Sequence, residues 1–335
     1  IDVGNKIVAP GLIDIHCHVF RDYAGNIDDI SGVRAGVTTI VDAGDATSDD
    51  LDEFRRVVMS DAKVRVYSLL SPYHFPVENE ELTPDGIVKC ARENPDQVKG
   101  IKVHIWPSIL EQYGLTHLET ARHAADEAGI RIMLHIGDLG PRDKPATSPE
   151  LTSKALDMLA PGDIMTHLFT PLTGGGLDDN LRVLPALTAA QERGVFMDTA
   201  VGDYQFGWEA ADAILSQGVY PDTIASDLDA HSQLARSNEP LVSGRRTTGR
   251  RAAPNRTLIE YMAYFLKLGF SLDDVIAMTS TTPAKVMGIY DAGGLSEGMP
   301  ADISILELVE GEFNLVDVTG VSRTANQALI PSLTV

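Results

Sequence analysis

Two histidines separated by one residue, His16 and His18, are the first side chains in this sequence that could do chemistry. They end a short apolar run, Leu12–His18, which follows Pro10-Gly11 and predicts a strand. Side chains alternate along a strand, so both imidazoles should share one face while Cys17 points the other way. Two ring nitrogens held at a strand end are typical of a metal site. The alternative is a pair of unrelated histidines on a half-buried strand.

Other residues able to bind a metal occupy the same kind of position. Lys102 lies in a predicted strand that leads into His104, and two later strands end in His135 and His167. The last predicted strand runs out into Asp227. If the carboxyl ends of these strands meet at one rim, four histidines, a lysine and an aspartate converge there, which chance explains poorly.

The elements that must position these residues are short β-rich runs, each followed by a helical pattern. The predicted strands are Leu12–His18, Thr38–Asp42, Val64–Leu70, Gly100–Val103, Arg131–His135, Asp163–His167, Val195–Asp198 and Thr223–Ser226. The predicted helices include Leu51–Met59, His117–Ala128, Leu181–Arg193, Trp208–Gln217, Thr257–Leu268, Leu272–Met278 and Pro283–Met287. Eight such repeats predict an α/β fold with a parallel sheet closed into a (β/α)8 TIM barrel, whose active site lies at the carboxyl ends of the strands. A doubly wound open sheet is the alternative.

The two ends of the chain predict a second, smaller unit. Residues 301–335 return to a β pattern, with strands expected at Asp302–Leu308 and Phe313–Val318, and the start of the chain is expected to join them. We therefore predict a small β-sandwich domain from residues 1–10 and 301–335 and a (β/α)8 metal-dependent domain from residues 11–300. The first residue is Ile1 rather than Met, so we expect upstream residues to be missing and the sandwich to be incomplete.

Composition excludes several classes of protein. The chain has 335 residues, 44% hydrophobic and 22% charged, which is typical of a soluble globular protein. A net charge of -21 opposes binding to nucleic acid or to an anionic membrane surface. No apolar run is long enough for a membrane span. Only two cysteines are present, which favours a reducing, cytoplasmic location.

The candidate residues suit a pair of divalent cations. Four imidazoles and one carboxylate would leave roughly three of the four positive charges uncompensated. A carbamate formed from Lys102 and CO₂ would supply an anionic bridge, and a bridging hydroxide would reduce the excess further. The predicted ligands are His16, His18 and Asp227 for one metal and His135 and His167 for the other, with Lys102 between them. The alternative for Lys102 is a rim lysine that reaches solvent.

Longer motifs resemble those of the amidohydrolase superfamily, of the dihydroorotase and hydantoinase type, and most of all the amidohydrolase/deacetylase metallohydrolase branch. They are APGLIDIHCHV (Ala9–Val19), GIKVH (Gly100–His104), MLHIGD (Met133–Asp138), DIMTHLF (Asp163–Phe169), GGGLDD (Gly174–Asp179), ERGVFMD (Glu192–Asp198), PDTIASDL (Pro221–Leu228), TPAKVMGI (Thr282–Ile289) and GGLSEGMPADISIL (Gly293–Leu306). The resemblance implies a distorted barrel, a β-sandwich from both termini, two zinc ions or another divalent metal, and the ligand roles given above.

The mechanism expected from these residues is attack of the bridging hydroxide on an acyl carbon. Asp227 would orient the hydroxide, accept its proton and pass it to the leaving nitrogen or oxygen. The predicted substrate contacts are His104, Asp203, Tyr204 and Arg245. His104 alternatively orients a metal ligand. The arginine-rich loop 236–251 would recognise an anionic small molecule, unless it is a solvated surface loop.

The sequence differs from the amidohydrolase/deacetylase branch in segments where substrate would bind. After the sixth-strand histidine it reads Leu168-Phe169-Thr170-Pro171 instead of Cys-Phe-His-Gly, and His104 stands where arginine is more usual. The altered loops after the sixth and seventh strands, the latter at Thr199–Tyr204, favour hydrolysis of an acyclic acyl amide or ester, in the deacetylase manner. The alternatives are a cyclic amide hydrolase and a scaffold protein that has lost catalysis. We also expect a homo-oligomer.

Overall fold

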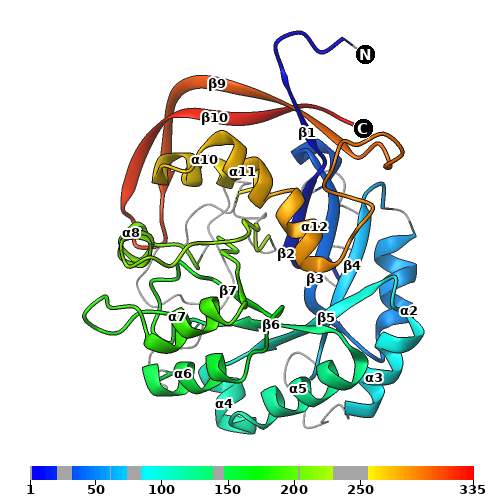
Figure 1. The fold of residues 1–335 in the computed structure, drawn as a ribbon, viewed down its shortest axis with the longest axis vertical. Coiled ribbons are helices and arrows are strands. Elements are labelled where there is room, and N and C mark those ends of the chain that lie inside the picture. Colours follow the sequence, from blue (N-terminus) through cyan, green and yellow to red (C-terminus); the bar gives the residue numbers. More distant parts are fainter. Residues whose placement is uncertain are drawn as a thin grey trace, which may run out of the picture.

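The computed structural model describes residues 2–20, 32–60, 62–73, 84–138, 147–202, 204–228 and 256–335. Its main sheet has seven strands, all parallel, hydrogen-bonded in their sequence order (Figure 1). They are β2 (Leu12–Cys17), β3 (Val37–Thr47), β4 (Arg65–Ser71), β5 (Val98–His104), β6 (Arg131–His135), β7 (Ile164–Thr166) and β8 (Phe196–Met197). Consecutive parallel order is the topology of a distorted TIM barrel, as predicted.

Residues 223–228 lie between the last strand of this sheet and the first, and they form hydrogen bonds towards both. The Val201 N–H donates to Ala225 O at 3.0 Å, and the Asp227 N–H donates to His16 O at 2.7 Å. The predicted eighth strand is therefore hydrogen-bonded on both sides without forming a regular strand. Its position brings Asp227 directly beside the end of β2.

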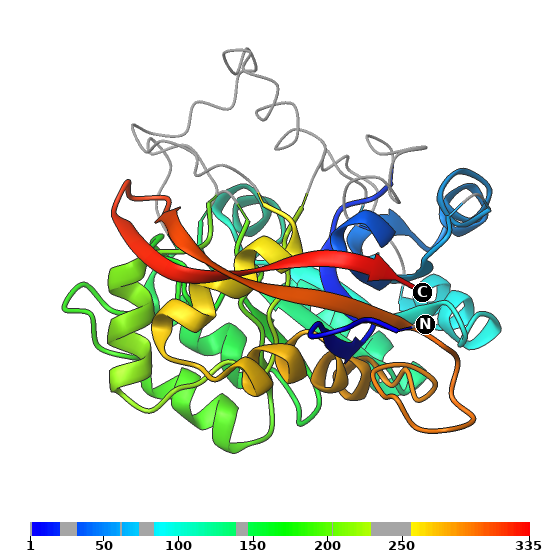
Figure 2. The same cartoon turned by 90° about the horizontal axis from the view of Figure 1, so that it is seen from above.

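Helices cover the outside of the sheet (Figures 1 and 2). They are α2 (Leu51–Phe54), continued by a π-helical turn (Arg55–Met59), α3 (Pro84–Glu93), α4 (Pro107–Tyr113), α5 (Thr116–Ala128), α6 (Pro149–Asp157), α7 (Pro185–Glu192), α8 (Trp208–Ser216), α10 (Leu258–Leu268), α11 (Leu272–Met278) and α12 (Thr281–Met287). A 3-10 helix spans Val33–Ala35. The helix predicted to start at Leu181 begins instead at Pro185, because Leu181 has a left-handed backbone and proline favours a first helical turn.

The chain ends form a separate antiparallel sheet, in the order β1-β9-β10. Its strands are β1 (Ile7–Pro10), β9 (Ile303–Val316) and β10 (Ser322–Thr334). Both long strands run side by side along one edge of the molecule (Figure 1). The two short tail strands predicted from the sequence are wrong in extent: β9 continues through Gly311, and β10 was not predicted. The domain boundaries at residues 10 and 301 stay a prediction.

Aromatic packing joins this terminal sheet to the barrel. The Trp208 indole stacks on Tyr264 with ring centroids 5.3 Å apart, and its Nε1 donates to Leu315 O at 3.2 Å. The guanidinium of Arg323 lies 4.6 Å above the same indole. Within the described ranges, no helix combines the length and apolar composition that crossing a membrane requires.

Candidate metal centre

The end of β2 and the Asp227 segment bring three of the predicted ligands together. His16 Nε2 lies 3.2 Å from Asp227 Oδ1, and His18 Nε2 lies 3.3 Å from the same oxygen. The hydrogen bond from Asp227 N to His16 O fixes this approach. One carboxylate oxygen therefore faces two imidazole nitrogens.

Lys102 is fully buried at the centre of this group. Its side chain is 0% exposed, and Nζ lies 2.7 Å from His16 Nε2. Gly44 packs against the lysine stem: a Cβ placed on Gly44 would lie 2.7 Å from Lys102 Cβ. The alternative of a rim lysine that reaches solvent is therefore wrong. A buried lysine is rare unless something pairs with it or neutralises it.

His135 and His167 form the opposite side of the site. Nε2 of His167 lies 2.8 Å from Nδ1 of His135, with ring centroids 4.1 Å apart. The ring centroids of His167 and His16 are 5.0 Å apart, so the two sides are contiguous. His16, His167 and Asp227 each offer a ligand atom within 4.8 Å of the other two. This close group takes one histidine from each predicted half, and the division of ligands between two metals stays a prediction.

Each of the four imidazoles is held at the ring nitrogen that faces away from this cluster. His16 Nδ1 is 2.9 Å from Thr166 Oγ1, and His18 Nδ1 is 2.6 Å from Asp45 Oδ1. The other two rings are held by backbone carbonyl oxygens, as described below. An oxygen partner on one nitrogen fixes the ring and leaves the other nitrogen free to bind a cation.

Backbone carbonyls hold the rings of the second half. His135 Nε2 is 3.1 Å from Gly137 O, and His167 Nδ1 is 2.9 Å from Ala200 O. The inward nitrogens are thus Nδ1 of His135 and Nε2 of His167. With Nε2 of His16 and His18, they make a nitrogen donor set that fits zinc.

Two predicted ligands have strained backbones. His167 has φ = 71° and Asp227 has φ = 52°, in the left-handed region that non-glycine residues seldom adopt. Such a conformation costs about 1–3 kcal/mol and is concentrated at functional sites. In both residues it lets the chain turn sharply at the carboxyl end of the sheet while the side chain stays in the site.

Burial and neighbouring charges set the protonation of the cluster. Burial lowers the pKa of His135 and of His167 well below the ordinary histidine value, so both rings are neutral at pH 7. Burial alone would raise the pKa of Asp227, but His16 and His18 hold it well below its usual range. Burial alone would lower the pKa of His18, but Asp45 and Asp227 raise it well above its usual range.

Burial lowers the pKa of Lys102 to about 8, against the partly opposing field of Asp227. The amine is therefore much closer to neutrality at physiological pH than a surface lysine is. A neutral amine is the form that can react with CO₂.

His104, the first predicted substrate contact, lies at the edge of this cluster. Its ring centroid is 5.0 Å from that of His135, and the ring stacks on Trp106 at 4.4 Å. The Tyr73 hydroxyl lies 2.5 Å from His104 Nδ1, and burial raises the pKa of Tyr73. Tyr73 therefore stays protonated and can donate to this nitrogen.

The other predicted substrate contacts are less fully placed. Tyr204 is half-buried in the loop after β8. It follows closely after Gly202, on which an added Cβ would lie 2.6 Å from Asp227 Oδ2. Asp203, Arg245 and the loop 236–251 lie outside the described residues.

Sequence reasoning missed several residues that support the site. Thr166 contacts His16 Nδ1 and donates to Asp198, and the Tyr73 hydroxyl contacts His104 Nδ1. Asp198 ends a predicted strand, so the strand-end argument itself could have included it. Asp45 follows the second predicted strand, but its contact with His18 depends on the bend of β3 and has no pattern in the sequence.

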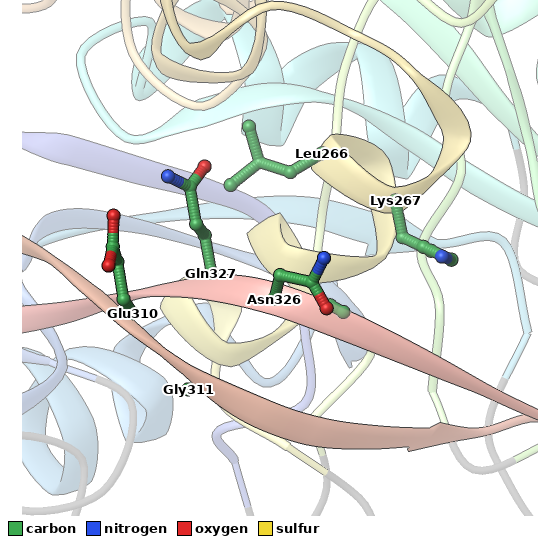
Figure 3. Close-up of a pocket in the computed structure, with 7 residues that line it drawn as sticks. Leu266, Lys267, Glu310, Gly311, Asn326 and Gln327 are labelled. Atoms are coloured by element: carbon green, nitrogen blue, oxygen red, sulfur yellow. The ribbon is translucent and has the colours of Figure 1, made fainter.

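A groove of about 700 Å³ lies elsewhere, between the end of α10 and the β9–β10 pair (Figure 3). It is lined by Leu266, Lys267, Glu310, Gly311, Ala325, Asn326 and Gln327. None of the predicted metal ligands contributes to it, and the lining has no histidine or cysteine. We attach no catalytic role to this groove.

Known proteins resemble this chain along nearly its whole length. The sequence model of the Amidohydrolase family matches residues 199–330. A deacetylase from Brucella anthropi is 25% identical over 99% of this chain and 79% of its own length. A deacetylase from Enterococcus faecalis is 26% identical over 98% of this chain and 85% of its own length.

Solved structures with the same fold cover nearly all of the chain. An adenine deaminase superposes with a TM-score of 0.82 at 26% identity, covering 98% of this chain and 85% of its own. A dihydroorotase superposes with a TM-score of 0.79 at 24% identity, over 98% of this chain and 82% of its own. Both likenesses extend across the barrel and the terminal sheet.

Proposed function

The chain belongs to the amidohydrolase superfamily and is a hydrolase acting on C–N bonds, and from this premise we propose that it is a binuclear zinc enzyme that cleaves an acyl amide or ester bond in the manner of a deacetylase. One observation carries the proposal. Asp227 Oδ1 lies within 3.3 Å of an inward nitrogen of both His16 and His18, beside the buried Nζ of Lys102.

The residues present fit a pair of divalent cations. Four rings offer an inward nitrogen while the outward nitrogen is held by an oxygen, which is the usual arrangement of zinc-binding histidines. We propose His16, His18 and Asp227 as ligands of one cation and His135 and His167 as ligands of the other. A carboxylated Lys102 would lie between them and add negative charge.

The cations, when bound, would polarise the acyl carbonyl and make a water molecule acidic near neutral pH. Asp227 is placed to accept the proton of that water, since its low pKa keeps it ionised and its Oδ1 faces the centre of the group. It would then deliver the proton to the leaving nitrogen or oxygen.

His104 is the described residue best placed to bind the substrate. We propose that Tyr73 donates to its Nδ1, so that Nε2 carries the ring proton and can donate to a carbonyl or carboxylate oxygen. We propose Tyr204, Asp203 and Arg245 as further contacts, and an anionic small molecule as the substrate.

The similar proteins favour a deacetylase-type reaction over the hydrolysis of a cyclic amide. The named deacetylases are 25–26% identical over almost the whole chain. The dihydroorotase is slightly below this level of identity and supports the fold alone. Replacement of the Cys-Phe-His-Gly pattern by Leu168–Pro171 points the same way, since this segment follows the sixth-strand histidine.

A substrate panel with controlled metal content tests the proposal. The protein is stripped with a chelator, reloaded with zinc and bicarbonate, and assayed on N-acyl amino acids, acyl esters and cyclic imides. We expect zinc-dependent hydrolysis of at least one acyclic amide or ester. Turnover of cyclic imides alone would favour the hydantoinase-like alternative, and activity that survives complete removal of metal would contradict the proposal.

A further inference from the structure

The two halves of the predicted metal site, His16 with His18 and His135 with His167, differ in the groups that contact their outward ring nitrogens. The outward nitrogens of His16 and His18 lead to carboxylates, whereas those of His135 and His167 meet backbone carbonyls. A carboxylate behind an imidazole raises its basicity and makes it a stronger ligand. A carbonyl supplies a dipole only.

His16 reaches a carboxylate through a hydroxyl. Thr166 Oγ1 lies 2.6 Å from Asp198 Oδ2 and 2.9 Å from His16 Nδ1. A hydroxyl has one hydrogen and an ionised carboxylate can only accept, so Thr166 donates to Asp198 and accepts from the His16 Nδ1–H. The lone pair of His16 is therefore on Nε2, which also suits the 2.7 Å contact with Lys102 Nζ.

Asp198 is a buried carboxylate that accepts its side-chain hydrogen bonds from hydroxyl groups, with His16 Nδ1 3.7 Å from its Oδ2. It is 0% exposed, and its two oxygens accept from Thr166 and from Thr223, the latter at 2.7 Å. Within the described ranges, no lysine or arginine forms an ion pair with it. Burying such a carboxylate is costly unless positive charge lies nearby. Lys102 supplies part of that charge, and a cation bound in front of His16 would add to it.

His18 reaches its carboxylate directly. Its Nδ1 is 2.6 Å from Asp45 Oδ1, so Nδ1 carries the proton and Nε2 faces Asp227. Asp45 itself is held in place, since Oδ2 accepts from Phe20 N at 3.3 Å and its own N–H donates to Asp42 Oδ2 at 3.0 Å. Both histidines of this half are thus oriented by fixed negative charge.

We propose that Asp45 and Asp198 are positioning residues that make the His16–His18–Asp227 position the tighter of two zinc positions, so that zinc fills it first. The inference rests on the proposed function, because it requires a rim that binds two cations. It adds the order in which zinc occupies the two positions. It attributes that order to Asp45 and Asp198, which do not touch the metal.

Zinc binding by the full chain, measured in competition with a chelator of known affinity, tests the order. The stripped wild-type protein should bind two zinc ions with separate dissociation constants, the first at least about 10-fold tighter. His135→Asn should keep the tight constant and lose the weak one. His18→Asn should lose the tight constant.

Variants of the supporting residues test the cause. Thr166→Val and Asp45→Asn should each weaken the tight constant by about 10- to 100-fold. Thr166→Ser, which keeps the hydroxyl, should restore it. Asp163→Asn, which changes a buried carboxylate at the amino end of β7, is the matched control and should leave both constants unchanged.

The outcomes separate this inference from the proposed function. Two zinc ions of equal affinity, or a tight constant that is the same in Thr166→Val and Asp45→Asn, would overturn the inference and leave the binuclear enzyme standing. A wild-type protein that binds no zinc would overturn both.

Discussion

We propose two roles for Asp227 that are usually in conflict, since a metal ligand gives up the basicity that a proton carrier needs. Its Oδ1 faces His16 and His18, while Gly202 packs against Oδ2. The second oxygen is thus confined to one small volume beside the loop after β8. A carboxylate held in this way can act on a proton without leaving its ligand position.

Asp227→Asn should separate the two roles. An amide keeps an oxygen in place but cannot accept the proton, so zinc should stay bound while kcat falls by about 10²- to 10⁴-fold. Zinc content and turnover are measured on the same sample. Asp222→Asn, at the start of the same segment, is the control, and full activity in Asp227→Asn would defeat the assignment.

Carboxylation of Lys102 should depend on pH. With a pKa of about 8, roughly one-tenth of the amine is neutral at pH 7, compared with about one part in three thousand for an ordinary lysine. Only the neutral amine reacts with CO₂, so at a fixed concentration of dissolved CO₂ carbamate formation during reloading with zinc should speed up from pH 7 to pH 9 and then level off.

Carbon-13 NMR after reloading with labelled bicarbonate measures this reaction. The carbamate signal should appear in the wild-type protein and be absent in Lys102→Arg. A signal that forms equally fast at pH 7 and pH 9 would show that Lys102 is not the titrating group.

At the scale of the element, β3 positions the lysine of β5. Gly44 has φ = 90°, and a Cβ there would lie 2.7 Å from Lys102 Cβ and 2.9 Å from its Cγ. Any side chain at this point must displace the lysine stem. Glycine is therefore required both for the backbone conformation and for space.

Gly44→Ala should lower zinc content and activity together. Gly218→Ala is the matched control, because its φ is 85° but nothing lies within 4 Å of the added Cβ. Both variants bear backbone strain, so both should lose stability. Unaltered zinc binding in Gly44→Ala would show that Lys102 has more room than the packing indicates.

The elements themselves were largely predictable because each strand is a short buried run with a clear boundary. β6 has the predicted bounds, Arg131–His135, and α11 has the predicted bounds, Leu272–Met278. β9 was harder to predict because it passes through Gly311 in a region that is mostly exposed. Such a strand lacks the hydrophobic alternation that defines a half-buried one.

The side chains gathered at the strand ends were predictable from the sequence, whereas their supporting contacts were not. Asp45 contacts His18 from the part of β3 where Gly44 has a positive φ and the register with β4 is irregular, and His16 meets Thr166 across the barrel. Contacts of this kind depend on tertiary geometry. Local sequence patterns carry no information about them.

At the scale of the whole molecule, the terminal sheet is joined to the barrel through Trp208. The indole is 1% exposed, and its backbone N–H donates to Asp317 Oδ2 at 2.8 Å. Trp208→Ala should lower the free energy of unfolding by about 3–5 kcal/mol, as for other buried aromatic truncations. Asp212→Asn, which removes only the exposed partner of Arg323, should cost less than about 1 kcal/mol.

Denaturant unfolding of both variants checks this prediction. A Trp208→Ala protein as stable as the wild type would show that the sheet is joined to the barrel elsewhere. The cytoplasmic location, the homo-oligomer and the lack of nucleic-acid or membrane partners stay predictions.

The most direct test of the central claim is anomalous diffraction at the zinc edge from crystals of the zinc-loaded protein. We expect two peaks about 3.5–4 Å apart, one beside His16 and His18 and one beside His135 and His167, with density extending beyond Lys102 Nζ. A single peak, or a zinc-loaded crystal with no peak at this rim, would contradict the binuclear account.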